Sequence, residues 1–212
     1  MKRFFLSITN SRIKSLFFVI ILYAVVIFCF ACIEKAELPI AWHINCSLDR
    51  YIPFSKYVSL FYCLWHVEIF VILLYLYLYK SKNEFLRSSL MIWLGFIVPI
   101  LFYLICPNEI DLRPATVKGN DIFAILTRIV WFFDSSRNVF PSGHAIISYL
   151  MTKIWKRNLS EKSGHLMTLL NMMIIVSTLF LKQHSIIDVI AGLITGIVIE
   201  MMCERMPHCM GS

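Results

Sequence analysis

Long apolar runs separated by polar and charged stretches make up most of the chain. A helix needs about 20 apolar residues to cross the roughly 30 Å hydrocarbon core of a bilayer, and runs of about this length recur along the sequence. They occupy residues 15–33, 57–79, 88–105, 139–155, 166–181 and 185–203. The pattern predicts an all-α, polytopic membrane bundle of six transmembrane helices.

The connections between these runs add one further element. The longest connection, residues 106–137, contains an amphipathic stretch from Ile122 to Phe133, which predicts a helix at the membrane interface. The first run is longer than the apolar core of a typical signal peptide, and no clear small-residue cleavage site follows it, so we expect an uncleaved span. No repeat or long hydrophilic linker divides the sequence, and residues 1–212 are expected to form a single domain.

Composition and charge agree with this interpretation. Hydrophobic residues make up 59% of the chain, which is high for a soluble domain. With both termini in the cytoplasm, the inner segments hold 12 of the 20 basic residues, as the preference of Lys and Arg for cytoplasmic loops requires. These residues are Lys2, Arg3, Arg12, Lys14, Lys80, Lys82, Arg87, Lys153, Lys156, Arg157, Lys162 and Arg205.

This orientation has two consequences for the expected function. It brings the starts of the fourth and sixth runs to the outer face of the cell membrane, where side chains from both can meet. It also explains the net charge of +7 by membrane topology. We therefore expect membrane lipids, and no nucleic acid, as partners.

Ionisable and thiol side chains leave two structural questions open. His66 and Glu68 lie in the second run, where an ionisable pair normally faces the bundle interior, and a packing pair near an interface is the alternative. Cys46 and Cys106 both fall in outer loops, so they form either a disulfide or two free thiols. The histidines and acidic residues show no metal-site pattern, and no metal or cofactor is expected.

The stretch from Asn138 to Ile146 carries the first candidate chemistry. Pro141 and Gly143 interrupt the chain where the fourth apolar run begins. A proline at a helix start leaves free backbone N–H groups there, and a glycine lets a bound group approach the backbone closely. The stretch therefore predicts an anion site at the start of a helix, with His144 just inside it.

A second stretch, about forty residues later, supplies a matching group. His184 and Asp188 are spaced i, i+4, so on a helix they share one face and can hydrogen-bond. A carboxylate on one ring nitrogen fixes the tautomer and leaves the other nitrogen free to attack or to transfer a proton. Two histidines, one oriented by an aspartate and both beside an anion site, favour phosphoryl transfer without a metal.

These residues resemble the motifs of the type 2 phosphatidic acid phosphatase superfamily, which are K-x6-R-P, P-S-G-H and S-R-x5-H-x3-D. Residues Pro141–His144 form a complete second motif. Ser177, His184 and Asp188 match the third motif at the right spacing, and Arg113–Pro114 matches the end of the first. The resemblance covers about residues 101–198.

The resemblance implies a role for each matching residue. His184 would be the nucleophile that forms a phosphohistidine, Asp188 would orient it, and His144 would protonate the leaving group. The phosphate would be bound by a bidentate guanidinium together with hydroxyl and backbone N–H donors. These phosphate-binding residues would be Arg113, Ser142 and Gly143.

Two positions depart from the family pattern. Cys106 stands where the first-motif lysine belongs, and Thr178 stands where the third-motif arginine belongs. The phosphate site is therefore two cations short, and Lys182, close to His184, is a candidate to replace one of them. The other candidates are Lys118 and Arg137.

The resemblance implies a metal-independent lipid phosphatase that acts on a lipid phosphate at the outer membrane face. The alternative is a phosphotransferase that moves a phospho-headgroup to a hydroxyl acceptor. Sphingomyelin and inositol-phosphorylceramide synthases resemble the superfamily in this way, because they keep two histidines and an aspartate and depart from the full motifs. A scaffold or transporter without activity is disfavoured by the intact set of His144, His184 and Asp188.

Overall fold

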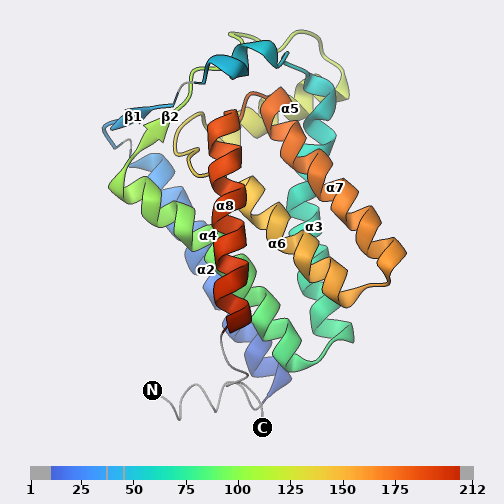
Figure 1. Ribbon diagram of the computed structural model, residues 1–212. Coiled ribbons are helices and arrows are strands. Elements are labelled where there is room, and N and C mark those ends of the chain that lie inside the picture. Colours follow the sequence, from blue (N-terminus) through green and yellow to red (C-terminus); the bar gives the residue numbers. More distant parts are fainter. Residues whose placement is uncertain (1–10, 37, 45, 206–212) are drawn as a thin grey trace.

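The protein is described by a computed structural model that covers residues 11–36, 38–44 and 46–205. Helices dominate it, which confirms the predicted all-α bundle, and a pair of two-residue strands joins two loops (Figure 1). The helices are α2 (Arg12–Lys35), α3 (Ser59–Tyr79), α4 (Lys82–Ile105), α5 (Ile122–Phe133), α6 (Gly143–Asn158), α7 (Glu161–Phe180) and α8 (Ile186–Arg205). The strands are β1 (Trp42–His43) and β2 (Asn108–Glu109), and two 3-10 turns, η1 (Ser47–Tyr51) and η2 (Lys56–Val58), precede α3.

Within the residues described, five helices are long and apolar enough to cross a membrane: α2, α3 with its η2 turn, α4, α7 and α8. They correspond to five of the six predicted runs. The remaining run forms α6, which has 16 residues, or about 24 Å of helix at 1.5 Å per residue. The count of six spans therefore stays a prediction. The helix expected in the longest connection is present as α5, with the predicted bounds Ile122–Phe133. Its location at the membrane interface stays a prediction.

Helix α6, which is shorter than the five helices named above, lies in the centre of the bundle. It packs against α4, α7 and α8 (Figure 1), and every residue from Gly143 to Trp155 is buried or half-buried. α6 is therefore surrounded on all sides along this stretch, although it carries polar side chains such as the fully buried Ser148. By contrast α2 lies at the edge and packs mainly on α4, with large apolar side chains such as Ile27 and Phe28 exposed.

Serine caps decide where several helices begin. The side chains of Ser81, Ser142 and Ser160 each accept a hydrogen bond from the backbone N–H three residues further on. This satisfies a donor that a helix start leaves free. Two predicted starts, at residues 88 and 166, were therefore late. α4 and α7 begin at Lys82 and Glu161, because their capped first turns are polar and resemble loops in the sequence.

The two ends of the bundle differ in content. α2 begins and α8 ends at one end, together with the α3–α4 and α6–α7 connections, whereas β1, β2 and α5 lie at the opposite end, which we call the motif end (Figure 1). The two short connections are joined where Lys80 Nζ donates to Asn158 O at 2.7 Å. At the motif end the parallel pairing of β1 with β2 joins the loop after α2 to the loop after α4. α6 and α8 both begin at the motif end.

The structure answers the two questions that the sequence left open. Glu68 is 5% exposed, inside the bundle, whereas His66 lies on an exposed edge of the same helix. The pair therefore does not face the interior together. Cys46 and Cys106 are both free thiols in the described part of the chain.

α8 approaches α6 closely at two glycines. A Cβ at Gly192 would lie 2.6 Å from Ser142 O, and one at Gly196 would lie 2.9 Å from the Tyr149 ring. The close approach at Gly192 requires glycine, because the atom that a side chain would meet belongs to the backbone. Ser142 N–H also donates to Asp188 O at 3.1 Å. The start of α6 and the first turns of α8 are therefore held as one unit.

Candidate active site

His184 lies in the short turn between α7 and α8. The turn closes back on α7, because the N–H groups of Gln183 and His184 donate to Thr178 O at 2.9 and 3.3 Å. Lys182 makes the reversal with a φ of 58°, in the left-handed region. The turn presents His184, which is 6% exposed, directly before α8.

Asp188, in the first turn of α8, orients His184. Its Oδ2 lies 3.1 Å from His184 Nδ1 and also accepts the N–H of Ser185 at 2.8 Å. Since a carboxylate accepts, we assign the ring proton to Nδ1, which leaves the lone pair on Nε2. The predicted i, i+4 pair is therefore formed, and the same carboxylate caps the start of the helix.

Asp49 supports the same turn from a distant loop, and the sequence gives no sign of it. Its carboxylate accepts from Ile186 N at 2.9 Å and from Ser185 Oγ at 2.5 Å. Asp49 is 2% exposed, so these hydrogen bonds are shielded from water. They fix the start of α8, and with it the position of His184.

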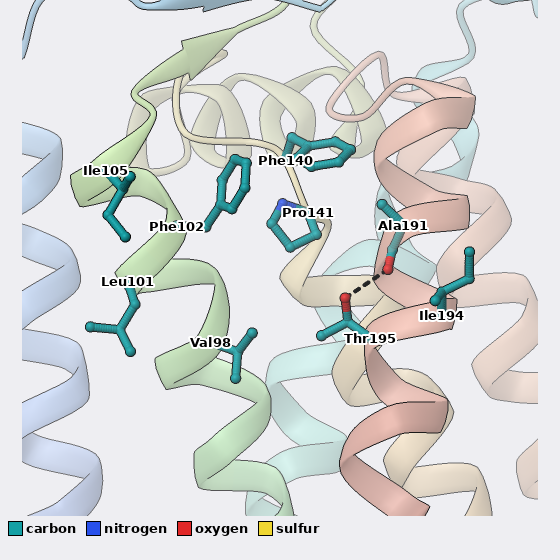
Figure 2. Close-up of a pocket in the computed structure, with 9 residues that line it drawn as sticks. All are labelled: Val98, Leu101, Phe102, Ile105, Phe140, Pro141, Ala191, Ile194 and Thr195. Atoms are coloured by element: carbon teal, nitrogen blue, oxygen red, sulfur yellow. Dashed lines mark hydrogen bonds between the residues drawn. The ribbon is translucent and has the colours of Figure 1, made fainter.

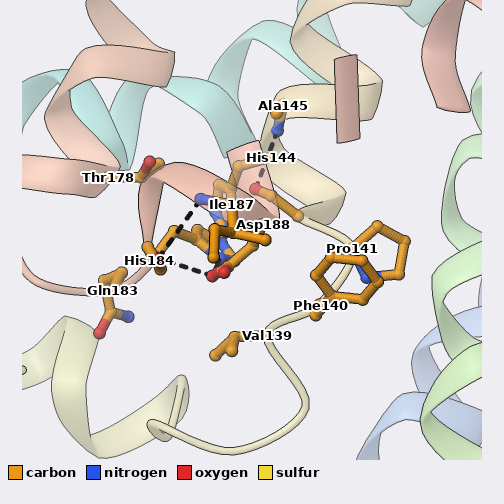
Figure 3. Close-up of polar contacts among 12 residues, drawn as sticks. Val139, Phe140, Pro141, His144, Ala145, Thr178, Gln183, His184, Ile187 and Asp188 are labelled. Atoms are coloured by element: carbon orange, nitrogen blue, oxygen red, sulfur yellow. Dashed lines mark hydrogen bonds and ion pairs between the residues drawn. The ribbon is translucent and has the colours of Figure 1, made fainter. Parts of the chain in front are cut away.

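His144 is the second residue of α6 and meets His184 ring to ring. His144 Nδ1 lies 3.4 Å from His184 Nε2. Because that nitrogen of His184 is the acceptor, the proton between the rings belongs to His144 Nδ1. His144 thus meets His184 and Asp188, which come about forty residues later in the sequence, at the motif end (Figure 3).

The start of α6 has the features of an anion site. Its first backbone N–H groups have no intrahelical acceptor and point out of the helix. A Cβ built on Gly143 would meet no atom nearer than Pro99 Cγ, at 4.0 Å, so the space beside this backbone is open. Ser142 Oγ accepts from Ala145 N at 3.2 Å and can still donate its own hydrogen.

Arg113 lies next to the turn that holds His184. Its guanidinium donates to Asp134 O at 2.7 Å and to the side-chain oxygen of Gln183, and it lies over the Trp131 ring at 5.2 Å. Burial lowers the pKa of Arg113, and the Asp134 carboxylate opposes this shift, so the group stays charged at neutral pH. Its Nε is buried and has no partner among the described residues.

Lys182 has a different position from the one expected of a phosphate ligand. Its ammonium donates to the carbonyl oxygens of Asp49 and Ile52 at 2.8 and 2.5 Å. Burial lowers the pKa of Lys182, with Asp49 opposing. The structure therefore does not bring Lys182 to the histidines, because the left-handed turn directs its side chain to the loop that contains η1.

The two residues that depart from the family motifs, Cys106 and Thr178, both have uncharged side chains. Cys106 ends α4 as a half-buried thiol, and Thr178 is fully buried with its hydroxyl on Ile175 O at 2.7 Å. Of the other proposed replacements, Arg137 donates to Leu38 O and Lys118 is exposed. Arg113 is therefore the cation that matches the family motifs and whose side chain directly contacts the turn that holds His184.

Three side chains on or near the site were missed by sequence reasoning. The rings of Tyr62 and Trp65 lie 4.4 and 4.1 Å from the His144 ring, and that of His66 lies 6.4 Å away. All three come from one stretch of α3. In the sequence Tyr62 and Trp65 read as part of a continuous aromatic and apolar run, so no local signal separates them from lipid-facing neighbours. His66 stands out there as an ionisable residue, but the motifs gave it no role.

An apolar groove of about 470 Å³ opens beside the site, between α4 and α8 (Figure 2). Phe140 and Pro141, which precede the start of α6, form part of its wall. The hydroxyl of Thr195 is turned to Ala191 O at 2.8 Å, so it presents its methyl group to the groove. The remaining lining residues are Val98, Leu101, Phe102, Ile105 and Ile194.

Comparison with known proteins agrees with this geometry. The model of the PAP2 superfamily matches residues 111–208, the part that carries Arg113, both histidines and Asp188. No curated protein matches the chain closely enough to count as a relative. The motif-bearing region therefore belongs to the PAP2 superfamily, whose members are phosphatases or related phosphotransferases. The long apolar helices show that the chain is a membrane protein.

Proposed function

We propose that this protein is a lipid phosphatase that cleaves a lipid phosphomonoester or diphosphate through a phosphohistidine. The observation that carries the proposal is the continuous line of contacts from Asp188 through His184 to His144. His184, in the middle of this line, supplies a lone pair, and His144, at its end, supplies a proton. A helix start and Arg113 lie beside the two histidines. No other described group of residues combines these functions.

The proposed reaction has two steps. In the first, the lone pair of His184 Nε2 attacks phosphorus, the bond from phosphorus to the leaving oxygen breaks, and His144 gives that oxygen its proton. In the second, water attacks the phosphohistidine, His144 takes a proton from the water, and the nitrogen–phosphorus bond breaks. Asp188 stabilises the charge that develops on the His184 ring in both steps.

A lipid substrate is supported by the groove between α4 and α8. A hydrocarbon chain held there would reach Phe140 and Pro141, so its headgroup would lie next to the start of α6. The groove is lined almost entirely by aliphatic and aromatic side chains, as a site for a lipid tail requires. The choice among lipid phosphates depends on the headgroup, which the phosphate site contacts.

The proposed orientation places the motif end at the outer face and both termini in the cytoplasm. In support, the α3–α4 and α6–α7 connections lie at the end of the bundle opposite the motif end (Figure 1), and Lys80, Lys82 and Lys156 lie in these connections or in the helix turns next to them. Cytoplasmic loops prefer such residues. Fusion of a reporter enzyme that is active only in the cytoplasm to residue 212 tests this orientation, and an inactive reporter on a folded protein would contradict it.

The central test is phosphate release from a panel of lipid phosphates by the detergent-purified protein in EDTA. The panel contains phosphatidic acid, phosphatidylglycerophosphate, undecaprenyl diphosphate and a lipid A phosphate. We expect release by the wild type, about 100-fold or more reduced in His144→Ala and abolished in His184→Ala. Millimolar vanadate, which mimics five-coordinate phosphorus, should inhibit. Equal release by His184→Ala, or activity unaffected by vanadate, would contradict attack by His184.

A phosphotransferase is the second candidate, and the uncharged Cys106 and Thr178 favour it. Loss of two cations while the histidines and Asp188 stay together fits a changed substrate better than a lost activity. The two functions differ in the molecule that resolves the phosphohistidine, which is water in one and a lipid or sugar hydroxyl in the other. If the panel releases no phosphate, the same lipids with added acceptor alcohols should give a phosphorylated alcohol.

A further inference from the structure

His144 stands between two aromatic rings that come from outside the matched family region. The Tyr62 and Trp65 rings each lie at 36° to the imidazole, with centroids 4.4 and 4.1 Å from it. The two residues are three positions apart on α3, so both face the same side of that helix. Tyr62 is 1% and Trp65 6% exposed, so water does not compete for these contacts.

Each of the two rings is itself fixed. The Tyr62 hydroxyl donates to an Asp134 carboxylate oxygen and accepts from Gln183 Nε2 at 3.3 Å. Gln183 directly precedes His184, so Tyr62 touches one histidine and is joined to the turn of the other. Trp65 packs edge-on against Phe96 of α4, with centroids 5.8 Å apart.

The resting distance between the histidines shows why such support matters. With His144 Nδ1 and His184 Nε2 only 3.4 Å apart, a phosphoryl group cannot fit between them, so the substrate must part the rings. His184 is tied to Asp188 and to a turn closed by backbone hydrogen bonds. His144 has no comparable tie, since its Nε2 is buried without a hydrogen-bond partner among the described residues. The imidazole that moves is therefore His144.

We infer that Tyr62 and Trp65 are positioning residues for His144. They restrict the tilt of the imidazole, so that the edge carrying Nδ1 stays directed at the leaving oxygen when a phosphoryl group enters. A proton donor that is misplaced by about 1 Å can lose 100-fold in rate. The inference rests on the proposed function, because it gives His144 the part of the acid.

The experiment compares two substrates that differ in their need for an acid. An alkyl phosphate releases a basic alkoxide that must be protonated, whereas p-nitrophenyl phosphate releases a stable anion that needs no proton. In Trp65→Leu we expect kcat/KM for the alkyl phosphate, which reports formation of the phosphohistidine, to fall about tenfold, as a partial loss of acid catalysis, with kcat/KM for p-nitrophenyl phosphate within about threefold. Tyr62→Phe keeps the ring and loses only the hydroxyl contacts, so its effect should have the same selectivity and be smaller.

Matched controls separate positioning from general damage. Trp93→Leu on α4 and Tyr75→Phe on α3 remove similar groups from half-buried sites, where Trp93 Nε1 and the Tyr75 hydroxyl bond to backbone oxygens. Neither control should change the ratio of the two rates. Trp65→Phe serves where Trp65→Leu does not fold in detergent, as judged by size-exclusion chromatography and thermal unfolding.

The outcomes separate the inference from the proposed function. Equal loss on both substrates in Trp65→Leu and Tyr62→Phe, or no loss on either, would overturn the positioning role while leaving the phosphatase intact. A wild type that cleaves neither substrate, with or without an acceptor alcohol, would overturn the proposed function and this inference together. A selective loss on the alkyl phosphate alone supports both.

Discussion

Helix α3 contributes to two buried polar clusters, and their difference shows which one carries chemistry. The motif-end cluster contains two facing imidazoles and an open helix start. The deep cluster, further along α3, is centred on Glu68, whose Oε1 accepts from Trp155 Nε1 at 2.8 Å and from Asn171 Nδ2 at 2.7 Å. The motif-end cluster consists of Tyr62, Arg113, Asp134, His144, Gln183, His184 and Asp188.

Burying polar groups costs free energy in both clusters, but the buried groups have a different role in each. In the deep cluster the contacts join α3, α6 and α7, and its hydrogen-bond donors, an indole and an amide, do not exchange protons at neutral pH. In the motif-end cluster the hydrogen bonds end on two groups that can both gain and lose a proton. Burial of a carboxylate in a membrane protein therefore does not by itself identify a catalytic group. A catalytic group is identified by its ability to exchange protons with a neighbouring group.

The largest expected effect on kcat comes from removing the proposed nucleophile, His184. His184→Ala should lower kcat by about 10⁴-fold or more, as removal of a nucleophile does elsewhere, with little change in thermal unfolding. The measurement is phosphate release beside a melting curve for the same preparation. A variant that keeps a tenth of the wild-type rate would show that the motif-end cluster is no more catalytic than the deep one.

The next effect tests how tightly the motif-end cluster is built. Gly192→Ala places a Cβ 2.6 Å from Ser142 O, so the start of α6 must move relative to α8. We expect kcat to fall about 10- to 100-fold through displacement of His144. Gly196→Ala is the control, because its Cβ meets the Tyr149 ring, one turn further from the histidines. Equal rates in the two variants would count against a rigid unit at the motif end.

The deep cluster should respond in the opposite way. Glu68→Leu leaves the Trp155 indole without an acceptor, at about 1–3 kcal/mol, and leaves the Asn171 amide only its hydrogen bond to Met167 O at 2.9 Å. Thermal unfolding should shift to lower temperature, while kcat per folded molecule stays within about twofold. A Glu68→Leu protein that melts normally and has lost its activity would move Glu68 into the catalytic machinery and break the comparison.

The smallest effect concerns the groove beside the motif-end cluster. Ile194→Trp fills part of the groove without touching the histidines, so KM for a long-chain lipid phosphate should rise about fivefold, and KM for a short-chain analogue should not change. Ile190→Trp, at another exposed position on α8, is the control. A rise for both chain lengths would mean that the groove does not receive the hydrocarbon chain.

The part of the site that is local in sequence could be predicted, and the part that depends on helix rotation could not. The i, i+4 pair of His184 and Asp188 follows from spacing, and its meeting with His144 follows from topology, because two predicted spans separate the starts of the fourth and sixth runs. The positions of Tyr62 and Trp65 around His144 do not follow, because aromatic and apolar residues lie on most sides of α3 and the sequence does not show which of them face α6. Asp49 lies in a loop whose path no pattern fixes.

Helix boundaries and the directions of long side chains show the same limit of prediction from sequence. The bounds of α5 were predicted correctly, since Asp121 caps a short and strongly amphipathic stretch by accepting from Phe123 N and Ala124 N. α4 and α7 begin earlier than predicted because serine caps precede their polar first turns. Lys182 was expected beside the phosphate from spacing alone, but the sign of one backbone angle sends its side chain the other way.

The aromatic walls of His144 have a consequence for the order in which the site is completed during synthesis. Chains are made from the amino terminus, and domains form as their segments emerge. α3 therefore enters the membrane before α6, and α8 enters after both. A nascent chain that ends before residue 186 already holds both rings and the acid that fits between them, but α8, which contains Asp188, has not yet been made. Cleavage chemistry thus becomes available only when the last described helix has been inserted, after the rest of the bundle is in place.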